Sequence, residues 1–416
     1  MTATIAGSQA ALKVLYPNGE PPKSIQEMFV ILKRLKKDTD FVGELAYVPI
    51  QNANPQGSSA DFSEAQANIY QGNYLRFSLS RVTHYGIARV TGEAAEAAVK
   101  SEGALVDLWD NETKGSSTTE MSTLATYLYG NGDATLGTMG GSGSVSSTSV
   151  TLASGTNMNY FELNMMLKTV SAVGLSPTVR AGKIRVTGID RRNRILTFAA
   201  NLDSGSTTGI TSPANTDYFV RAGDQAGSSA TVITGLAELV KGGTAPGTVH
   251  GLNRNADPTR LAGTSIDYTG WAPEDAVVDA SAQVGFHGLG YPNVLVCNNI
   301  EAATLKKSLS TKLVFNRPGG EKATYSFSDV VIEGEDGPIE VVADPFCPRN
   351  TAYLLKLDAF SLFSLKAAPH LAKYDGMEFM RRPDADAYEV RFAFYGNLKC
   401  KNPGPHVKLT NFCVTS

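Results

Sequence analysis

The apolar positions between residues 91 and 132 follow the period of an α-helix. Hydroxyl side chains crowd residues 113–119, which propensity alone would not make helical. A Gly-Asn-Gly turn at 130–132 gives a stop signal. The pattern predicts a long helix from Ala104 to Tyr129, preceded by a short one that begins near Glu93. The apolar stripe lies three or four residues apart, at Leu105, Leu108, Trp109, Met121, Leu124 and Leu128.

A second, shorter helical pattern lies near the N-terminus. Residues 1–22 are small and polar and are expected to form an arm. Ser24 and Glu27 form a capping box, after which Ile25, Phe29 and other apolar residues share one face. The basic residues that follow are predicted to lie at the helix end, where the helix dipole favours cations. We expect this helix to dock on a protein surface, with a membrane surface as the alternative; its basic residues are Lys33, Arg34, Lys36 and Lys37.

Two alternating runs flank a polar stretch and predict a long hairpin. Glu44–Gln51 is extended and contains a proline, as in an exposed strand, and Tyr74–Val90 alternates apolar and polar residues. About twenty turn-rich residues, Asn52–Gly72, separate them. Because an isolated two-stranded ribbon is only marginally stable, and no adjacent sequence supplies a sheet partner, we expect it to lie on another subunit.

The character changes after the long helix. Thr138–Gly235 is rich in Gly, Ser and Thr with short alternating runs, and we interpret it as an inserted β domain with a hairpin at Lys183–Phe198. A low-complexity linker is the alternative at Gly140–Gly155. The predicted strands are Val145–Leu152, Lys183–Ile189, Arg194–Ala199 and Asp217–Val220.

From Gly235 onward the pattern is α/β. Pro273–Phe286 and Ile300–Leu309 are predicted helices, the second capped by Asn298 or Asn299. The predicted strands are Asn293–Cys297, Tyr325–Glu333, Pro338–Val342, Tyr353–Leu357, Ser361–Leu365 and Tyr388–Leu398.

Composition narrows the class of protein. A chain of 416 residues suggests two or three domains, and a net charge of −3 gives no basic field for nucleic acid. The four cysteines include no CxxC pair, which fits a reducing compartment better than a zinc site, with a disulfide as a minor possibility. Residues 1–20 lack a signal-peptide pattern, and no apolar run reaches membrane-spanning length. We therefore expect a protein made and used in the cytosol.

A search for catalytic motifs returns little. The sequence contains no Walker loop, GxSxG elbow or HExxH motif. Asn253, Asn255 and Asp257 alternate as at the start of a calcium loop, but Pro258 replaces the turn glycine. The five histidines are dispersed, and the pairs at 191–192 and 381–382 are the candidates for phosphate contact among the arginines. We expect no enzyme activity, metal or cofactor.

The order of these elements resembles the major capsid protein of tailed bacteriophages, with the Hong Kong 97-type fold. An arm, a basic-ended helix, a polar-tipped hairpin, a long helix, a β insertion, an α/β region and a returning strand follow one another. The resemblance spans about residues 40–412. It rests on Tyr85–Glu93, Leu124–Gly137, Gly251–Gly263, Asn293–Asn298 and Asp384–Tyr395.

The resemblance implies an α+β fold with an N-terminal arm, an extended β-hairpin loop, a spine-helix peripheral domain and an axial domain, plus the small β insertion. The arm and short helix cover 1–37, and the extended loop covers 38–91 and crosses a neighbouring subunit. The spine helix is 92–137, the insertion 138–235, and the axial domain 289–372. The peripheral domain continues in 236–288 and in the returning strands of 373–416.

The resemblance also implies a function and partners. The chain would form hexamers and pentamers of itself in an icosahedral head, assembled in the host cytoplasm and found in the virion. Scaffolding, portal and decoration proteins are expected partners, with weak non-specific contact to packaged double-stranded DNA and none to membrane. Leu105, Trp109, Leu124 and Leu128 would pack the spine helix. The expected subunit-interface residues are Ile25, Phe29, Tyr47, Pro49, Asn54, Phe62, Tyr70, Arg76 and Arg81.

One departure from the family concerns the lattice. The prototype cross-links its shell through a lysine in the extended loop, but no lysine occurs between Lys37 and Lys100. We therefore expect a non-covalent lattice, and the short arm implies a separate scaffolding protein. The alternatives are an encapsulin-like nanocompartment shell, a tail-tube or other β-rich structural protein, and a hydrolase of unrecognised type.

Overall fold

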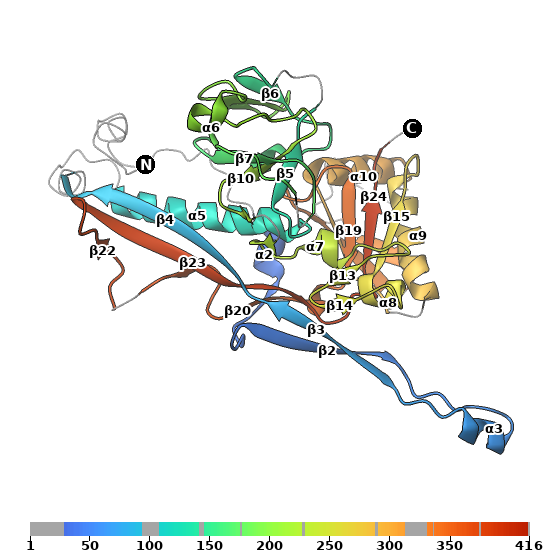
Figure 1. Cartoon of the computed structure of the whole chain (residues 1–416). Coiled ribbons are helices and arrows are strands. Elements are labelled where there is room, and N and C mark those ends of the chain that lie inside the picture. The colour runs from blue at the N-terminus through green and yellow to red at the C-terminus, as the bar shows by residue number, and fades with distance from the viewer. Residues whose placement is uncertain are drawn as a thin grey trace, which may run out of the picture.

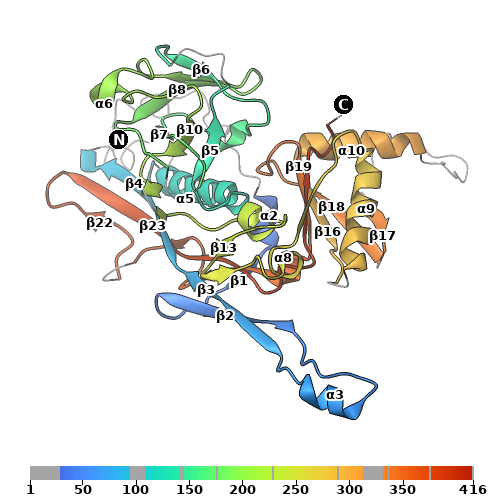
Figure 2. The same cartoon turned by 45° about the vertical axis from the view of Figure 1, so that its right-hand side comes forward.

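The computed structural model describes residues 29–93, 108–140, 145–174, 177–226, 229–287, 290–312, 331–335, 337–373 and 376–414 (Figure 1). Within these ranges, three six-stranded sheets surround a long helix, and a two-stranded hairpin projects from the body. Figures 1 and 2 show the hairpin pointing away from the rest of the molecule in both views.

The long helix α5 (Leu108–Leu128) forms within the predicted range. The predicted start, with Leu105, and the side chain of Trp109 lie outside the described residues. The hydroxyl-rich middle is helical despite its low propensity, and α5 packs along β4 there. Its hydroxyls are accommodated by bonds to the preceding turn, since Thr119 Oγ1 donates to Gly115 O at 3.0 Å, and Thr123 Oγ1 just beyond it donates to Thr119 O at 2.9 Å. A helix of this length is inconsistent with the mostly β tail-tube alternative.

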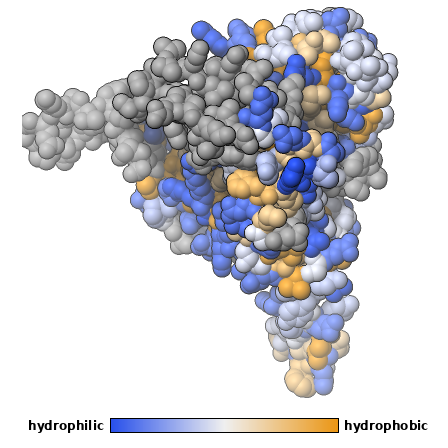
Figure 3. Space-filling view, turned by 90° about the vertical axis from the view of Figure 1, so that its left-hand side faces the viewer, coloured by the Kyte–Doolittle hydropathy of each residue, from blue (hydrophilic) through white to orange (hydrophobic). Residues whose placement is uncertain are grey.

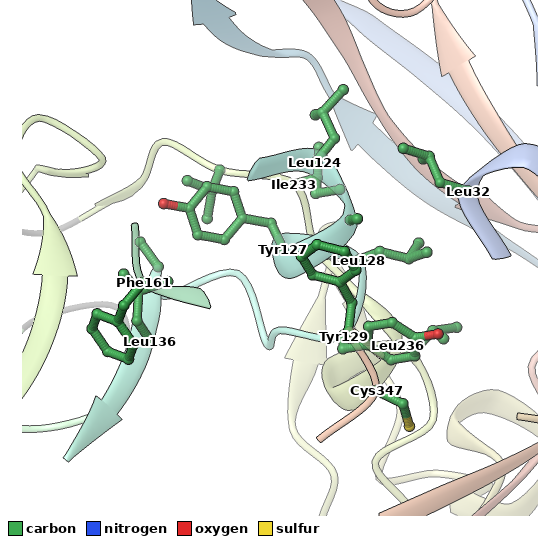
Figure 4. Packing of buried hydrophobic residues seen from close by; sticks show 14 of the residues in the cluster. Leu32, Leu124, Tyr127, Leu128, Tyr129, Leu136, Phe161, Ile233, Leu236 and Cys347 are labelled. Carbon is green, nitrogen blue, oxygen red and sulfur yellow. The ribbon is translucent and has the colours of Figure 1, made fainter. Parts of the chain in front are cut away.

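The C-terminal end of α5 lies in the largest core. Residues 123–129 are buried around the whole helix, and Leu124 and Leu128 are each 1% exposed. Figure 4 shows these two leucines in one cluster with Leu32 of the N-terminal segment and with Leu236. Both leucines, which were expected to pack the helix, are thus core residues.

The first sheet, called here the long sheet, is built on β23 (Ala387–Cys400). Every residue of β4 (Val82–Thr91) pairs antiparallel with β23, and α5 lies along β4. A side chain at Gly86 would place Cβ 3.3 Å from Ser116 Oγ and Glu120 Oε2 of α5, so this glycine permits the close approach. The other strands are β1 (Lys36–Asp38), β20 (Phe360–Ser364), β21 (His370–Leu371) and β22 (Met380–Arg381).

The long sheet corrects two predictions. The run Tyr74–Val90 is not one strand: β3 (Asn73–Ser80) stays in the hairpin, whereas β4 leaves it to pair with β23. The extended loop therefore ends near Arg81 rather than at residue 91. The N-terminal helix α2 (Val30–Arg34) also stops early, and Lys36 and Lys37 lie in β1, paired with β20, instead of at the helix end. In both places sheet pairing decides the backbone conformation.

The second sheet, the axial sheet, carries the second core. Its strands follow the order β15, β24, β19, β16, β18, β17, and α9 (Pro273–Phe286) and α10 (Asn299–Lys312) pack with it. Both helices form where predicted, and Asn298 Oδ1 accepts a hydrogen bond from Ile300 N. The strand bounds are β15 (Thr264–Asp267), β16 (Val294–Cys297), β17 (Val331–Gly334), β18 (Gly337–Ala343), β19 (Thr351–Leu355) and β24 (Val407–Thr410).

The axial sheet and the long sheet each draw on more than one of the predicted segments. Helix α9 and strand β24 were assigned to the peripheral domain, but their apolar side chains enter the axial core. Conversely, β20 and β21 fall within 289–372, yet they pair with β23 of the long sheet. The chain crosses between the two sheets more often than a linear division into segments allows.

The third sheet forms the predicted insertion domain, with the order β5, β10, β7, β8, β9, β6. The predicted hairpin is β8 (Ile184–Asp190) with β9 (Ile195–Phe198). Two further strands match predicted runs, β6 (Ser149–Thr151) and β10 (Tyr218–Arg221). Strand β5 (Thr135–Thr138) begins before the predicted start of the insertion at Thr138. The sequence did not single out β7 (Met166–Val170).

Short elements connect these sheets. They are the helices η1 (Met158–Tyr160), α6 (Gly205–Thr208), α7 (Leu236–Leu239), α8 (Pro258–Ala262) and η2 (Leu357–Ala359), and the strands β11 (Gln225–Ala226), β12 (Ser229–Ala230), β13 (Thr248–Val249) and β14 (Leu252–Asn253).

One loop, Asp344–Cys347, joins the parts of the body. The Asp344 carboxylate accepts hydrogen bonds from Ile31 N at 3.1 Å, from the Tyr129 hydroxyl at 2.9 Å and from Phe346 N at 2.9 Å. The Asn157 side chain of the insertion domain donates to both Pro345 O and Cys347 O. These bonds connect the N-terminal segment, the end of α5, the insertion domain and the axial sheet at one point. We call this loop the junction loop.

A charged cluster holds β4 against α5 and the insertion domain. His84 Nδ1 lies 2.8 Å from both carboxylate oxygens of Glu120, whose side chain is 2% exposed. His84 Nε2 lies 3.7 Å from Asp224 Oδ1, and the Tyr127 hydroxyl donates to Asp224. Burial alone lowers the pKa of His84, but Asp224 and Glu120 outweigh it and raise the pKa from 6.5 to about 9. The imidazole is therefore charged at neutral pH.

The cluster predicts a loss of stability in alkaline solution. Because the folded pKa of His84 is raised, its contribution is complete below pH 6.5 and is lost as pH rises through about 9. We expect the free energy of unfolding to fall by about 2–3 kcal/mol across this window. The measurement is urea denaturation from pH 6 to pH 10.

The variant His84→Gln should lack this fall, whereas His287→Gln, at an exposed position after α9, should keep it. Equal pH dependence in His84→Gln and the wild type would contradict the assignment.

Candidate assembly surface

The base of the projecting hairpin is fixed to the body. Strands β2 (Leu45–Ala53) and β3 pair antiparallel, and Val48 and Phe77, each 5% exposed, pack on Val249. Leu79 forms a second small cluster with Phe41 and Phe363. Burying a Phe or Leu side chain contributes about 1.5–3 kcal/mol, so these contacts hold the hairpin in a defined direction.

Backbone and polar contacts reinforce this base. Ser78 N donates to His250 O at 2.7 Å, and Asn397 Nδ2 donates to Ser80 O at 3.0 Å. The loop beneath is held by Arg254, whose buried guanidinium contacts Glu238 Oε1 at 2.6 Å and Pro246 O at 3.0 Å. Arg254 lies in the Gly251–Gly263 motif, whose acidic and amide residues were weighed as a calcium loop. Asp257 instead caps α8 by accepting a hydrogen bond from Arg260 N, and the described residues contain no group of three or more His, Cys, Asp or Glu that could hold a metal ion.

The hairpin exposes large apolar side chains along one face and at its tip. Five large hydrophobic side chains of the hairpin are more than half exposed. Figure 3 shows hydrophobic residues along the hairpin and at its tip. Contiguous exposed apolar surface is typical of protein–protein or membrane interaction sites. The residues are Tyr47 (55%), Phe62 (79%), Ile69 (68%), Tyr70 (76%) and Tyr74 (71%).

The tip has its own ordered structure, which the sequence did not predict. A short helix α3 (Phe62–Ala67) forms there, capped by Asp61 Oδ1, which accepts hydrogen bonds from Ser63 N and Glu64 N. Before and after this helix, Gln56 and Tyr70 pair in an isolated antiparallel β-bridge. Asp61 and Glu64 are the charged residues between Asn52 and Gly72, so the tip is acidic as well as apolar.

The predicted interface residues fall into four groups. Phe29 is 4% exposed and stacks on Phe346 at 5.7 Å, so it belongs to the core and its assignment to the interface was wrong. Arg81 supports the hairpin base by donating to Gly43 O. Ile25 lies outside the described residues. The others lie on the hairpin surface: Tyr47, Pro49, Asn54, Phe62, Tyr70 and Arg76, the last with its guanidinium 4.5 Å from the Tyr47 ring centroid.

A second surface, absent from the predicted set, lies on β4 and β23. We call it the ribbon face. Tyr85 and Ile87 are 56% and 52% exposed there. Beside them, Glu389 accepts 2.6 Å hydrogen bonds from both Arg89 Nε and Arg391 Nε. Burial alone raises the pKa of Glu389, but the two arginines outweigh it and lower the pKa. Two guanidinium groups therefore share the Glu389 carboxylate on this face, and Asp384, whose pKa is lowered by Arg382 and also by Arg89, adds a carboxylate nearby.

The described structure contains few features of an enzyme. Of the histidines, His84 is paired with carboxylates as above, whereas burial lowers the pKa of His250 to about 4 and that of His406 to about 3. Burial raises the pKa of the Cys400 and Cys413 thiols to about 12, and all four cysteines are free. Among the described residues, no helix is both long and apolar enough to cross a membrane.

The chain is similar to known proteins in its structure. No family model matches the sequence, and no curated protein matches it. The capsid subunit of cyanophage A-1(L) has a TM-score of 0.55 at 14% identity over 97% of each chain. A chain of Mycobacterium phage Bobi has a TM-score of 0.46 at 11% identity over 98% of each.

The SrpI encapsulin of Synechococcus elongatus PCC 7942 has a TM-score of 0.41 at 10% identity, over 100% of this chain and 98% of that one. Of these three, the cyanophage subunit has a TM-score above 0.5, and the assignment rests on it. The similarity predicted from the order of sequence motifs is thus confirmed at the level of the fold. The chain has the α+β fold of a phage capsid protein, the Hong Kong 97-type fold, with a β-rich insertion domain.

Proposed function

We propose that this chain is the major capsid protein of a tailed bacteriophage, a structural and non-enzymatic subunit. Copies of it form hexamers and pentamers that assemble in the host cytoplasm into an icosahedral head around double-stranded DNA. The observation that carries the proposal is the projecting hairpin, which is fixed at its base and leaves apolar side chains uncovered on its outer half. A second copy of the chain is the partner that would cover them.

The ribbon face is the surface that fits the hairpin tip. The tip carries two carboxylates and exposed Phe62 and Tyr70, whereas the ribbon face carries Arg89, Arg391 and exposed apolar residues. Complementary charge steers such a contact and fixes its register. Because hairpin and ribbon face are different surfaces, the contact is head-to-tail and closes into a ring when the rotation permits.

The remaining partners follow from the proposed role. Assemblies of this kind bury about 2,000–5,000 Å² per interface, which scaffolding and decoration proteins would help to form and stabilise. A portal protein would occupy one vertex. The near-neutral net charge suits weak, non-specific contact with packaged DNA, since a strongly basic wall would resist its release.

The lattice is proposed to be non-covalent, because the segment between Lys37 and Lys100 has no lysine to form an isopeptide bond. Boiled denaturing gels of mature particles should show this chain as intact monomers. Ladders of covalent oligomers would refute a non-covalent lattice.

The tip aromatics should affect assembly without affecting folding. Phe62 and Tyr70 have few contacts to lose, so Phe62→Ser/Tyr70→Ser should change the free energy of unfolding by less than about 0.5 kcal/mol. The double variant should nevertheless form few closed shells, as counted by electron microscopy. Leu163→Ser, at an exposed apolar residue of the insertion domain, is the matched control and should assemble normally. If both variants assemble alike, the tip is not an interface.

Removing the tip altogether gives a stronger test. Ala53 pairs with Asn73, so deletion of residues 54–71 brings ends together that already lie side by side. The shortened chain should fold with an unchanged circular dichroism spectrum, apart from α3, and should fail to close shells. Normal particles from the shortened chain would disprove the role assigned to the hairpin.

A further inference from the structure

Four arginines converge on one pocket between the insertion domain and the axial sheet. The pocket has a volume of about 260 Å³ and opens between the turn of the β8–β9 hairpin, the segment before η1, and the start of α10. The assembly role proposed above uses none of these residues. Its charged lining residues are Arg191, Arg192, Arg194 and Arg349.

Three of these arginines are presented by one tight turn. Asp190 Oδ1 accepts hydrogen bonds from Arg192 N and Asn193 N, each at 3.0 Å, and Arg194 has a φ of +58°. The turn therefore places three guanidinium groups within four residues. Arg349 approaches from the loop before β19, on the axial side. The sequence shows the pair at 191–192 but could not place Arg349 beside it.

The positive charge is only partly neutralised. Arg191 contacts Glu162 at 3.1 Å through Nη2 and donates to Met158 O at 2.7 Å through Nη1, whereas Arg349 contacts Glu301 at 2.8 Å through Nε alone. Arg194 Nε faces a carbonyl, Leu152 O, at 3.4 Å. Arg192 interacts with the nearby Asp190 carboxylate through its charge, and the pocket lining itself contains no Asp or Glu. Donors therefore remain for a ligand that carries negative charge.

The start of α10 adds to the same field. Asn298, Ile300 and Asn350 line the pocket, and the helix that begins at Asn299 is 14 residues long. A helix N-terminus carries about half a positive charge and favours anions. The Asn298 side chain already accepts a hydrogen bond from one of the first backbone N–H groups of this helix, that of Ile300. The helix N-terminus is therefore an addition to the arginines and not the main source of positive charge.

We propose that this pocket binds phosphate groups, either a free oligophosphate such as pyrophosphate or the phosphodiester end of a single nucleic-acid strand. Planar guanidinium groups match phosphate oxygens two at a time, which favours arginine over lysine at such sites. The recess is too small for a duplex but accommodates one or two phosphate groups. Because its walls come from two parts of the chain, a bound phosphate also ties the insertion domain to the start of α10.

The test is titration of the full-length chain with sodium pyrophosphate at constant ionic strength. Binding should be saturable by calorimetry and should raise the melting temperature, as for any ligand that binds only the folded state. Arg192→Gln/Arg194→Gln should weaken binding by about a hundredfold, about tenfold for each charged hydrogen-bond donor. Both side chains are at least partly exposed, so the variant should fold, and its melting temperature without ligand verifies this.

The matched control is Arg381→Gln, an exposed arginine on β22, which should bind pyrophosphate as the wild type does. A single-stranded oligonucleotide that displaces pyrophosphate identifies a nucleic-acid strand as the source of the phosphate, and failure to displace it identifies the free anion. The proposal is overturned if sodium chloride reproduces the effect of pyrophosphate, if the double variant binds as the wild type does, or if a glutamate peptide binds and pyrophosphate does not. Since assembly is not measured, these outcomes are independent of the capsid proposal.

Discussion

The Asp344 carboxylate is the interaction on which the arrangement of the body depends. It lies in a core, where burial raises its pKa, and hydrogen bonds from Phe346, Ile31 and Tyr129 oppose that rise. A buried carboxylate is tolerated only when such partners surround it. Because Ile31 and Tyr129 lie far from residue 344 along the chain, satisfying this one group requires the N-terminal segment and the end of α5 to meet the axial sheet.

The rest of the junction loop extends the same constraint. The side chains of Asn157 and Asn298 donate to the same two carbonyls, Pro345 O and Cys347 O, from the insertion domain and from the start of α10. The Tyr160 hydroxyl donates to Phe346 O. Carbonyls turned into a core must be paired, and here each pair joins two parts of the fold. The insertion domain is thus positioned by hydrogen bonds as well as by apolar packing.

The body also sets the direction of the hairpin that projects from it. The hairpin leaves the body in a direction set by Val48, Phe77 and Leu79, and its outer half finds no cover in its own chain. The ribbon face is similarly exposed, and it carries two arginines where the tip carries two carboxylates. In the assembly proposed above, copies of the chain would cover both apolar surfaces. The fixed direction of the hairpin would matter there, because small errors in direction would accumulate around a closed shell.

The sequence by itself determined the elements whose signals are local. The α5, α9 and α10 helices, the β8–β9 hairpin and the paired strands of the projecting loop follow from periodicity, caps and turns, and their order identified the fold. Tertiary structure decided everything that depends on distant partners. Lys36 and Lys37 pair with β20 instead of ending a helix, β4 leaves the hairpin for β23, and Phe29 enters the core against Phe346.

The same division applies to the hairpin, the ribbon face and the arginine pocket. The exposed aromatics of the hairpin could be predicted because a polar-tipped ribbon has no neighbour in sequence. The ribbon face and the arginine pocket could not, since each unites residues from distant segments, such as Arg89 with Glu389 and Arg194 with Arg349. Local sequence sets which backbone conformations are accessible to a segment, whereas long-range pairing and the burial of polar groups select among them and bring the functional surfaces together.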